Sequence, residues 1–111
     1  MTAMRIEQTG DTLRIYGVKQ LDAATATDFQ DKVTEAMTGA FRHIEVDLSR
    51  TIFLDSCGQG RLVALRKLVC GRGGTVRLLN PAPPVQQMLE LTRLHRVLEV
   101  VRRGEIAATP P

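Results

Sequence analysis

Hydrophobic and polar residues alternate over several short stretches of the chain, as they do in strands with one buried face. Two of these stretches flank Thr9-Gly10-Asp11, which predicts a hairpin. The five stretches predicted as strands are Met4–Gln8, Thr12–Tyr16, His43–Leu48, Thr75–Leu79 and Val97–Val101. A further short apolar strand is expected to run into Asp55-Ser56-Cys57-Gly58.

Between these stretches, apolar residues recur at helical spacing and predict three amphipathic helices. The first is capped by Asp22 or Thr25, ends at Gly39, and buries Phe29, Val33, Ala36 and Met37. The second runs from about Gly58 to Val69, buries Leu62, Leu65, Leu68 and Val69, and turns Arg61, Arg66 and Lys67 to solvent. The third follows the proline-rich turn at 80–84 and is made amphipathic by Val85, Met88, Leu89 and Thr92.

Alternating strands and helices predict an α/β layer fold. We expect a mixed β-sheet of about four to five strands packed by about four helices. A chain of 111 residues is most economically one domain, here 1–103, followed by a short flexible C-terminal tail at 104–111.

The composition narrows the class of protein. No stretch approaches the roughly 20 apolar residues of a membrane span, and Arg5, Glu7 and Asp11 interrupt any signal-like N-terminal run. We therefore expect a cytoplasmic protein without membrane insertion.

Cys57 and Cys70 would lie roughly 20 Å apart at opposite ends of one helix, so neither a disulfide nor a metal site is expected.

Charge is distributed unevenly along the chain. Residues 1–60 carry six Lys/Arg and nine Asp/Glu, whereas residues 61–103 carry nine Lys/Arg, among them Arg77, and two Glu. Such a basic surface suits nucleic acid, anionic lipid or an acidic protein, or it is simply the solvated side of its elements. With Tyr16, Phe29, Phe41 and Phe53 as the only aromatic residues, direct binding of nucleic acid by base stacking is not expected.

The Asp55-Ser56 junction lacks the sequence features of a catalytic site. A nucleophile elbow needs glycine two residues before the serine, where this chain has Leu54, and nothing local ties His43 or His95 to Ser56. Cys57 could become reactive at a helix start, but a small buried cysteine is the commoner outcome. No phosphate-binding loop motif is present. We therefore expect neither an enzyme nor a bound cofactor.

The simplest structural role for Ser56 is that of a helix N-cap. The same position also suits a phosphoryl group, because free N–H groups and the positive end of the helix dipole accept an anion. A phosphate there would alter the binding of an acidic partner more than it would alter folding.

Three blocks of residues together resemble the STAS domains of bacterial anti-sigma factor antagonists. The central block is Ile44-x-Val46-Asp47-Leu48-Ser49 followed by Phe53-Leu54-Asp55-Ser56-x-Gly58, Leu62 and Leu65. The other two are Gly17…Leu21-Asp22-x-x-Thr25-Ala26 and Gly73-Gly74…Leu79-Asn80-Pro81…Val85…Met88-Leu89…Leu94. The resemblance covers roughly residues 4–101.

The resemblance implies a non-enzymatic switch in the control of transcription. Ser56 would be the residue phosphorylated by an anti-sigma factor serine kinase, the unphosphorylated form would bind that kinase, and a PP2C-type phosphatase would reset it. The expected partner-binding residues are Asp22, Thr25, Asp55, Ser56, Cys57, Gly58 and Arg61. The alternative role is a constitutive STAS subunit of a lipid-transport ABC complex.

Three features depart from the family pattern. Cys57 replaces a residue that is usually Ser, Thr or Ala, which removes a second hydroxyl and makes redox sensitivity conceivable. The segment Val18-Lys19-Gln20 is longer than usual before the loop that carries Asp22. Arg61 places a cation in what is expected to be the first turn of the helix, where it could meet a phosphate or an acidic partner.

Overall fold

A five-stranded mixed sheet organises the part of the chain that the structure, a computed structural model, describes: residues 4–37 and 41–101. The strand order is β1-β2-β4-β6-β7, with β1 and β2 antiparallel and the other neighbours parallel. The bounds are β1 Arg5–Thr9, β2 Thr12–Tyr16, β4 His43–Asp47, β6 Val76–Leu79 and β7 Glu99–Val101. Two further strands, β3 (Gln20–Leu21) and β5 (Phe53–Leu54), form a separate parallel pair. The predicted mixed sheet is confirmed.

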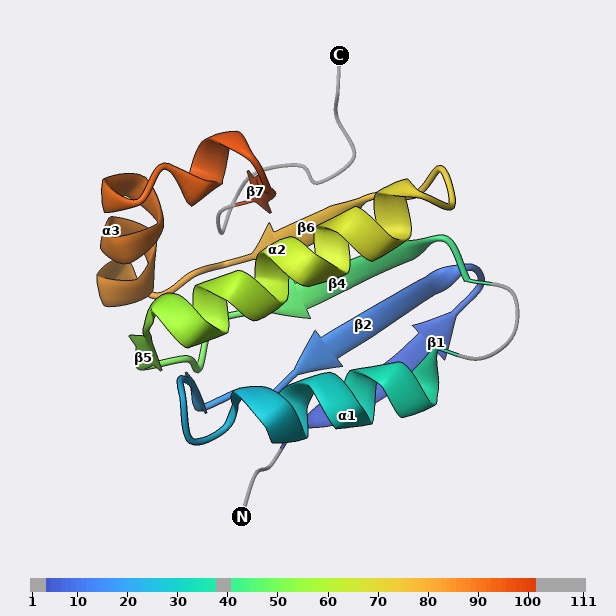
Figure 1. Ribbon diagram of the computed structural model, residues 1–111, viewed down its shortest axis with the longest axis horizontal. Helices are drawn as coiled ribbons and strands as arrows, with labels where there is room; N and C mark the ends of the chain where they lie inside the picture. Colours follow the sequence, from blue (N-terminus) through green and yellow to red (C-terminus); the bar gives the residue numbers. More distant parts are fainter. Residues whose placement is uncertain (1–3, 38–40, 102–111) are drawn as a thin grey trace.

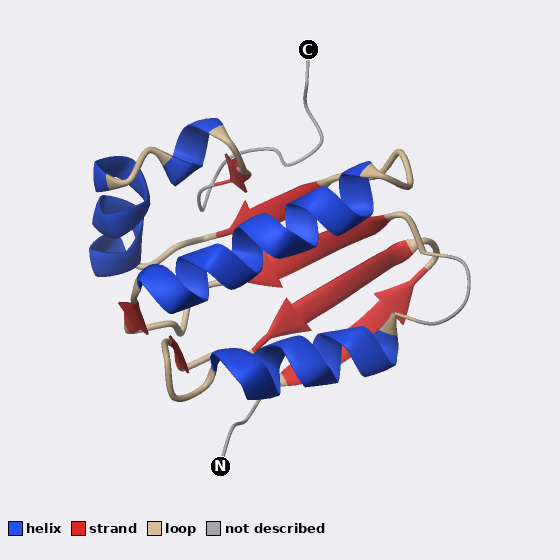
Figure 2. Cartoon of the chain, viewed as in Figure 1, coloured by secondary structure: helices blue, strands red, loops and turns tan. Residues whose placement is uncertain are grey.

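Two long helices cover the same face of this sheet, α1 (Ala26–Ala36) and α2 (Ser56–Cys70) (Figure 1). The third, α3 (Pro83–Leu91), lies at the end of the sheet near β5, and the short 3₁₀ helix η1 (Leu94–Arg96) leads into β7 (Figure 2). Within the described residues there are thus three α-helices and one 3₁₀ helix, in place of the roughly four helices expected.

The core lies between the sheet and its two long helices. On the sheet side, Leu13, Ile15, Ile44, Val46 and Leu78 are 2% exposed or less. The predicted face of α2 is correct for Leu62, Leu65 and Val69 but wrong for Leu68, which is 51% exposed. Because a helix turns about 100° per residue, Leu68 lies roughly 90° from the centre of the buried stripe.

One predicted strand boundary needs adjustment, and two other expectations lie outside the described residues. The last strand begins at Glu99 rather than Val97, because residues 94–96 close a 3₁₀ turn instead of extending. Gly39, expected to end the first helix, and the expected tail at 104–111 lie outside the described residues. The C-cap of α1 is Met37.

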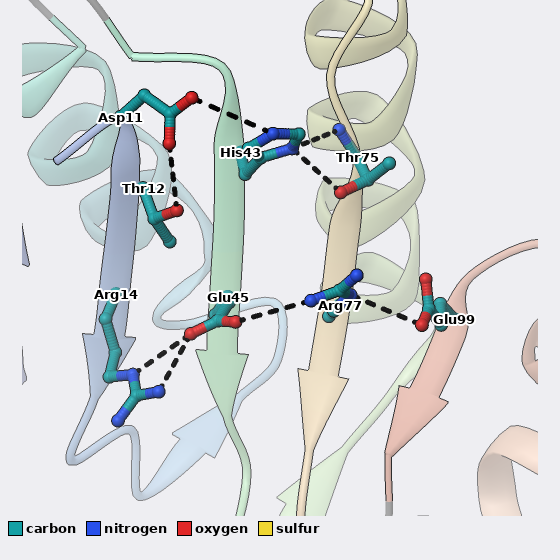
Figure 3. A network of polar contacts seen from close by, with 8 residues as sticks. All are labelled: Asp11, Thr12, Arg14, His43, Glu45, Thr75, Arg77 and Glu99. Atoms are coloured by element: carbon teal, nitrogen blue, oxygen red, sulfur yellow. Dashed lines mark hydrogen bonds and ion pairs between the residues drawn. The ribbon is translucent and has the colours of Figure 1, made fainter. Parts of the chain in front are cut away.

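The face of the sheet opposite the helices carries a row of charged residues that runs across all five strands. Cross-strand register aligns Glu7, Arg14, Glu45, Arg77 and Glu99 in one row of alternating sign. Glu45 lies 2.9 Å from Arg14 and 3.9 Å from Arg77, and Arg77 lies 3.2 Å from Glu99 (Figure 3). We call these five residues the charge row. Arg77, assigned from sequence to a basic surface, is therefore neutralised here by two carboxylates.

Candidate functional site

The start of α2 is organised by Asp55 rather than by Ser56. Asp55 has extended backbone angles, and its Oδ1 accepts a hydrogen bond from the N–H of Gly58 at 3.0 Å. Asp55 is therefore the N-cap, and the expectation that Ser56 caps the helix is wrong. Ser56 is the first helical residue and its side chain is exposed. Its hydroxyl is therefore not needed for capping.

The second carboxylate oxygen of Asp55 ties a neighbouring loop to the helix start. Asp55 Oδ2 accepts from the N–H of Ala23 at 3.0 Å, and the N–H of Asp55 donates to the carbonyl of Leu21 at 3.2 Å. The hydrogen bonds from Gly58 and then Ala23 lower the pKa of Asp55, although partial burial opposes them. The group is thus held as a carboxylate, and it joins two segments that are 32 residues apart in sequence.

The loop between β3 and α1 is closed by Asp22 and Thr25. Asp22 Oδ1 accepts from the N–H groups of Ala24 and Thr25 at 3.0 and 3.1 Å, while Oδ2 accepts from Gln20 Nε2 at 3.0 Å. The Thr25 hydroxyl accepts from the N–H of Asp22 at 3.0 Å. Thr25 is the N-cap of α1 by backbone position, but its side chain makes no capping bond. Both residues shape the loop that Asp55 holds.

Position 58 requires glycine, because the backbone at Leu21 is in direct contact with α2 there. A Cβ added to Gly58 would lie 2.0 Å from the carbonyl oxygen of Leu21. Only glycine permits this approach, so Gly58 is buried and serves the packing of β3 against α2. By contrast, a Cβ at Gly60 meets nothing within 4 Å.

Two other predicted site residues are placed differently from expectation. Cys57 is exposed beside Ser56, so the expectation of a small buried cysteine is wrong: the second helical position points away from the sheet. Arg61 lies in the second turn of α2, because the helix begins two residues earlier than predicted. Its guanidinium donates to Oε1 of Gln30 on α1, so Arg61 links the two helices.

Sequence reasoning missed two exposed apolar residues just before this site. Ile52 is 69% exposed and Phe53 is 50% exposed, although the next residue, Leu54, is 2% exposed. The N–H of Ile52 donates to the carbonyl of Lys19 at 2.8 Å, and Phe53 is paired with Gln20 across β3–β5. The alternation of Phe53 and Leu54 within a strand was the available signal. The backbone therefore holds two large apolar side chains toward solvent beside Asp55-Ser56.

The remaining candidates for chemistry lie elsewhere. His43 Nδ1 accepts from the N–H of Thr75 at 3.2 Å on the open face of the sheet, and His95 Nδ1 lies 3.4 Å from the Leu89 carbonyl. Cys57 and Cys70 are both free thiols. Among residues 4–37 and 41–101, no three His, Cys, Asp or Glu side chains are grouped as metal ligands. In the same ranges, no helix is both long and apolar enough to cross a bilayer.

Two helices on one face of a mixed sheet, with an exposed serine behind a capping aspartate, define a small α/β domain whose distinctive site is a helix start. The model of the STAS domain family matches residues 3–108. The chain belongs to the STAS domain family.

Similar proteins include anti-sigma factor antagonists. An anti-sigma F factor antagonist of Paenibacillus polymyxa is 29% identical over 58 residues, which are 52% of this chain and about half (50%) of that relative. The structure of the anti-sigma factor antagonist SpoIIAA in its unphosphorylated form matches with a TM-score of 0.76 and 25% identity, covering 91% of this chain and 90% of that one. SpoIIAA of Bacillus in the phosphorylated form matches with a TM-score of 0.69 and 24% identity, covering 91% and 93%. The chain thus has a fold like that of anti-sigma factor antagonists.

Proposed function

We propose that this chain is an anti-sigma factor antagonist whose binding is switched by phosphorylation of Ser56. In its unphosphorylated form it binds an anti-sigma factor that is also a serine kinase, and a PP2C-type phosphatase removes the phosphate. One observation carries the proposal. Asp55, not Ser56, caps α2, so the exposed Ser56 hydroxyl is available for phosphorylation.

The helix start explains why a phosphate would change binding rather than folding. A phosphoryl group adds about 1.5 to 2 negative charges, which the positive end of the helix dipole tolerates. Beside Asp55 and Asp22 it would concentrate negative charge on the surface offered to the partner. A partner that presents an acidic or apolar group here would be repelled or left unsatisfied. The existence of SpoIIAA in phosphorylated and unphosphorylated forms, both of this fold, supports the proposal.

The proposed contact surface consists of polar residues at the start of α2 and apolar residues just before it, both held in place by supporting residues. Ser56 and Cys57 lie exposed in the first turn of α2, and Ile52 and Phe53 supply apolar area. Asp22, Thr25, Asp55 and Gly58 shape and hold this surface through their internal bonds and packing, and Arg61 braces α2 against α1.

The test is a phosphorylation assay with the kinase that copurifies with the wild-type chain. We expect wild type to gain the mass of one phosphoryl group, Ser56→Ala to gain none, and Ser49→Ala to behave as wild type. Ser49 is the matched control because it is the only other serine in the chain. Phosphate on another residue, or copurification of a transporter subunit equally with wild type and Ser56→Asp, would contradict the switch and favour a constitutive subunit.

A further inference from the structure

Strand β1 forms one edge of the main sheet, and its outer side has no strand beside it in the described part of the chain. Thr9 faces Thr12 across the Gly10-Asp11 turn, so these two residues form a hydrogen-bonded pair. Hydrogen-bonded pairs alternate along antiparallel strands, which places Arg5 and Glu7 in bonding positions toward β2. The main-chain N–H and C=O of Ile6 therefore point outward from the sheet.

Native edge strands usually carry features that prevent pairing with another chain, such as proline, lysine or a bulge. The sequence of β1, Arg-Ile-Glu-Gln-Thr, contains no proline, and its register with β2 is unbroken. Its two charged residues, Arg5 and Glu7, have opposite signs, so they repel a strand of like charge but can pair with an antiparallel copy of β1. Ile6 is half-buried and packs against the core, while Arg5 and Glu7 are exposed. The outer side of β1 is thus suited to accept another strand.

We propose that β1 pairs antiparallel with β1 of a second copy of this chain, with the twofold axis at Ile6. In this arrangement, the two Ile6 residues exchange both main-chain hydrogen bonds. Arg5 of each copy lies opposite Glu7 of the other, so the contact contains two opposite-charge pairs. The proposal is independent of Ser56, which is on α2.

Charge selects this register over its neighbours. Moving the axis by one residue places Glu7 against Glu7 or Arg5 against Arg5, which is unfavourable for residues directly opposite each other. Sliding one strand along the other by a single residue, so that Arg5 lies opposite Ile6, would set the charged face of one strand against the core face of the other. Among the registers centred on Arg5, Ile6 or Glu7, only the one centred on Ile6 avoids both penalties, and it is the one that brings both charged residues of β1 opposite a partner of the other sign.

The charge row gives independent support for the pairing. Along this row the sign alternates from Glu99 through Arg77, Glu45 and Arg14 to Glu7. The next residue in line would be Arg5 of the second copy, which continues the alternation. A contact made by one short strand buries much less than the roughly 1,200 Å² of a stable complex, so the dimer should be weak. We expect a dissociation constant on the order of 0.1 to 1 mM.

Sedimentation equilibrium from about 0.05 to about 2 mM in reducing buffer tests this directly, because the reductant excludes disulfide-linked dimers. We expect Arg5→Glu and Glu7→Arg each to weaken association at least about tenfold, since two attractive pairs become repulsive. The double variant Arg5→Glu/Glu7→Arg restores both pairs with exchanged partners and should regain the wild-type constant.

Matched controls separate this contact from a general effect of charge. Lys32→Glu and Glu35→Arg make the same charge changes at exposed positions of α1 and should leave association unchanged. Thermal unfolding of each variant confirms that it is folded. A wild-type chain that stays monomeric at about 2 mM, or a double variant as weak as the single ones, would overturn the proposal.

Discussion

The open face of the sheet and the start of α2 both carry charged or polar side chains, but they use them differently. In the charge row, Glu45 is shared by Arg14 and Arg77, so each charge has an opposite neighbour. At the helix start, the Asp55 carboxylate is satisfied by backbone N–H groups, while Ser56 and the apolar Phe53 remain exposed.

The difference shows that charged residues on a surface do not by themselves make it a binding surface. Opposite charges set one per strand satisfy each other and favour one strand register. Exposed apolar side chains beside the Ser56 hydroxyl are not covered by any of the described residues, and such exposed apolar groups usually mark an interaction site. Changes to the two regions should therefore have separable effects on stability and on partner binding.

The largest effect is expected from Gly58→Ala. The new methyl group would collide with the carbonyl of Leu21, which belongs to the backbone and has little freedom to move. Urea unfolding should show a loss of about 3 kcal/mol or more, together with weaker partner binding. Gly60→Ala, in the same helix but facing open space, should instead stabilise by about 0.5 to 1 kcal/mol. Equal results for the two variants would contradict the close contact of β3 with α2.

Glu45→Lys breaks the charge row at its centre. It replaces the contacts to Arg14 and Arg77 by repulsion, so we expect a loss of about 1 to 2 kcal/mol that shrinks in high salt. Glu35→Lys on α1 makes the same charge change and should alter stability by less than about 0.5 kcal/mol. Partner binding should be unchanged by either. A loss of binding in Glu45→Lys would mean that the open face also contacts the partner.

The sequence predicted much of this frame but not all of the site. Strand β2 and the apolar face of α1 were readable because period and burial agree there. The sequence could not show whether Asp55 or Ser56 caps α2, because the side-chain oxygen of either residue can do so. The hydrogen bond from the N–H of Ala23, which is distant in sequence, fixes Asp55 as the cap. The pairing of Arg77 depends on register with β4 and β7, which no local pattern reveals.

Asp55 should give stability a specific pH dependence. Its pKa is lowered in the folded chain, so its stabilising contribution is complete above the unfolded pKa of about 3.9 and is lost as pH falls through the folded value. Asp55→Asn should have a lower urea midpoint than wild type near pH 6, and the difference should shrink toward pH 3 and below. A difference that stays constant with pH would contradict the carboxylate cap.

The smallest effect on stability is expected from Ile52→Ser and Phe53→Ser, because neither side chain belongs to the buried core: Ile52 is 69% exposed and Phe53 is 50% exposed. Unfolding free energies should change by less than about 0.5 kcal/mol, yet partner affinity should fall about tenfold or more. Leu91→Ser, at an apolar side chain 73% exposed on α3, is the matched control and should bind as wild type. Unaltered affinity in Ile52→Ser and Phe53→Ser would remove these residues from the contact surface.

The most direct test of the proposed switch is a calorimetric titration of the proposed partner, an anti-sigma factor kinase captured with the wild-type chain, with four forms of the chain. These are wild type, Ser56→Ala, Ser56→Asp, and Thr34→Asp, which adds the same charge at an exposed position of α1. We predict that Ser56→Ala and Thr34→Asp bind like wild type, and that Ser56→Asp binds at least about tenfold more weakly. Equal affinity of all four forms would contradict the claim that charge at Ser56 controls binding.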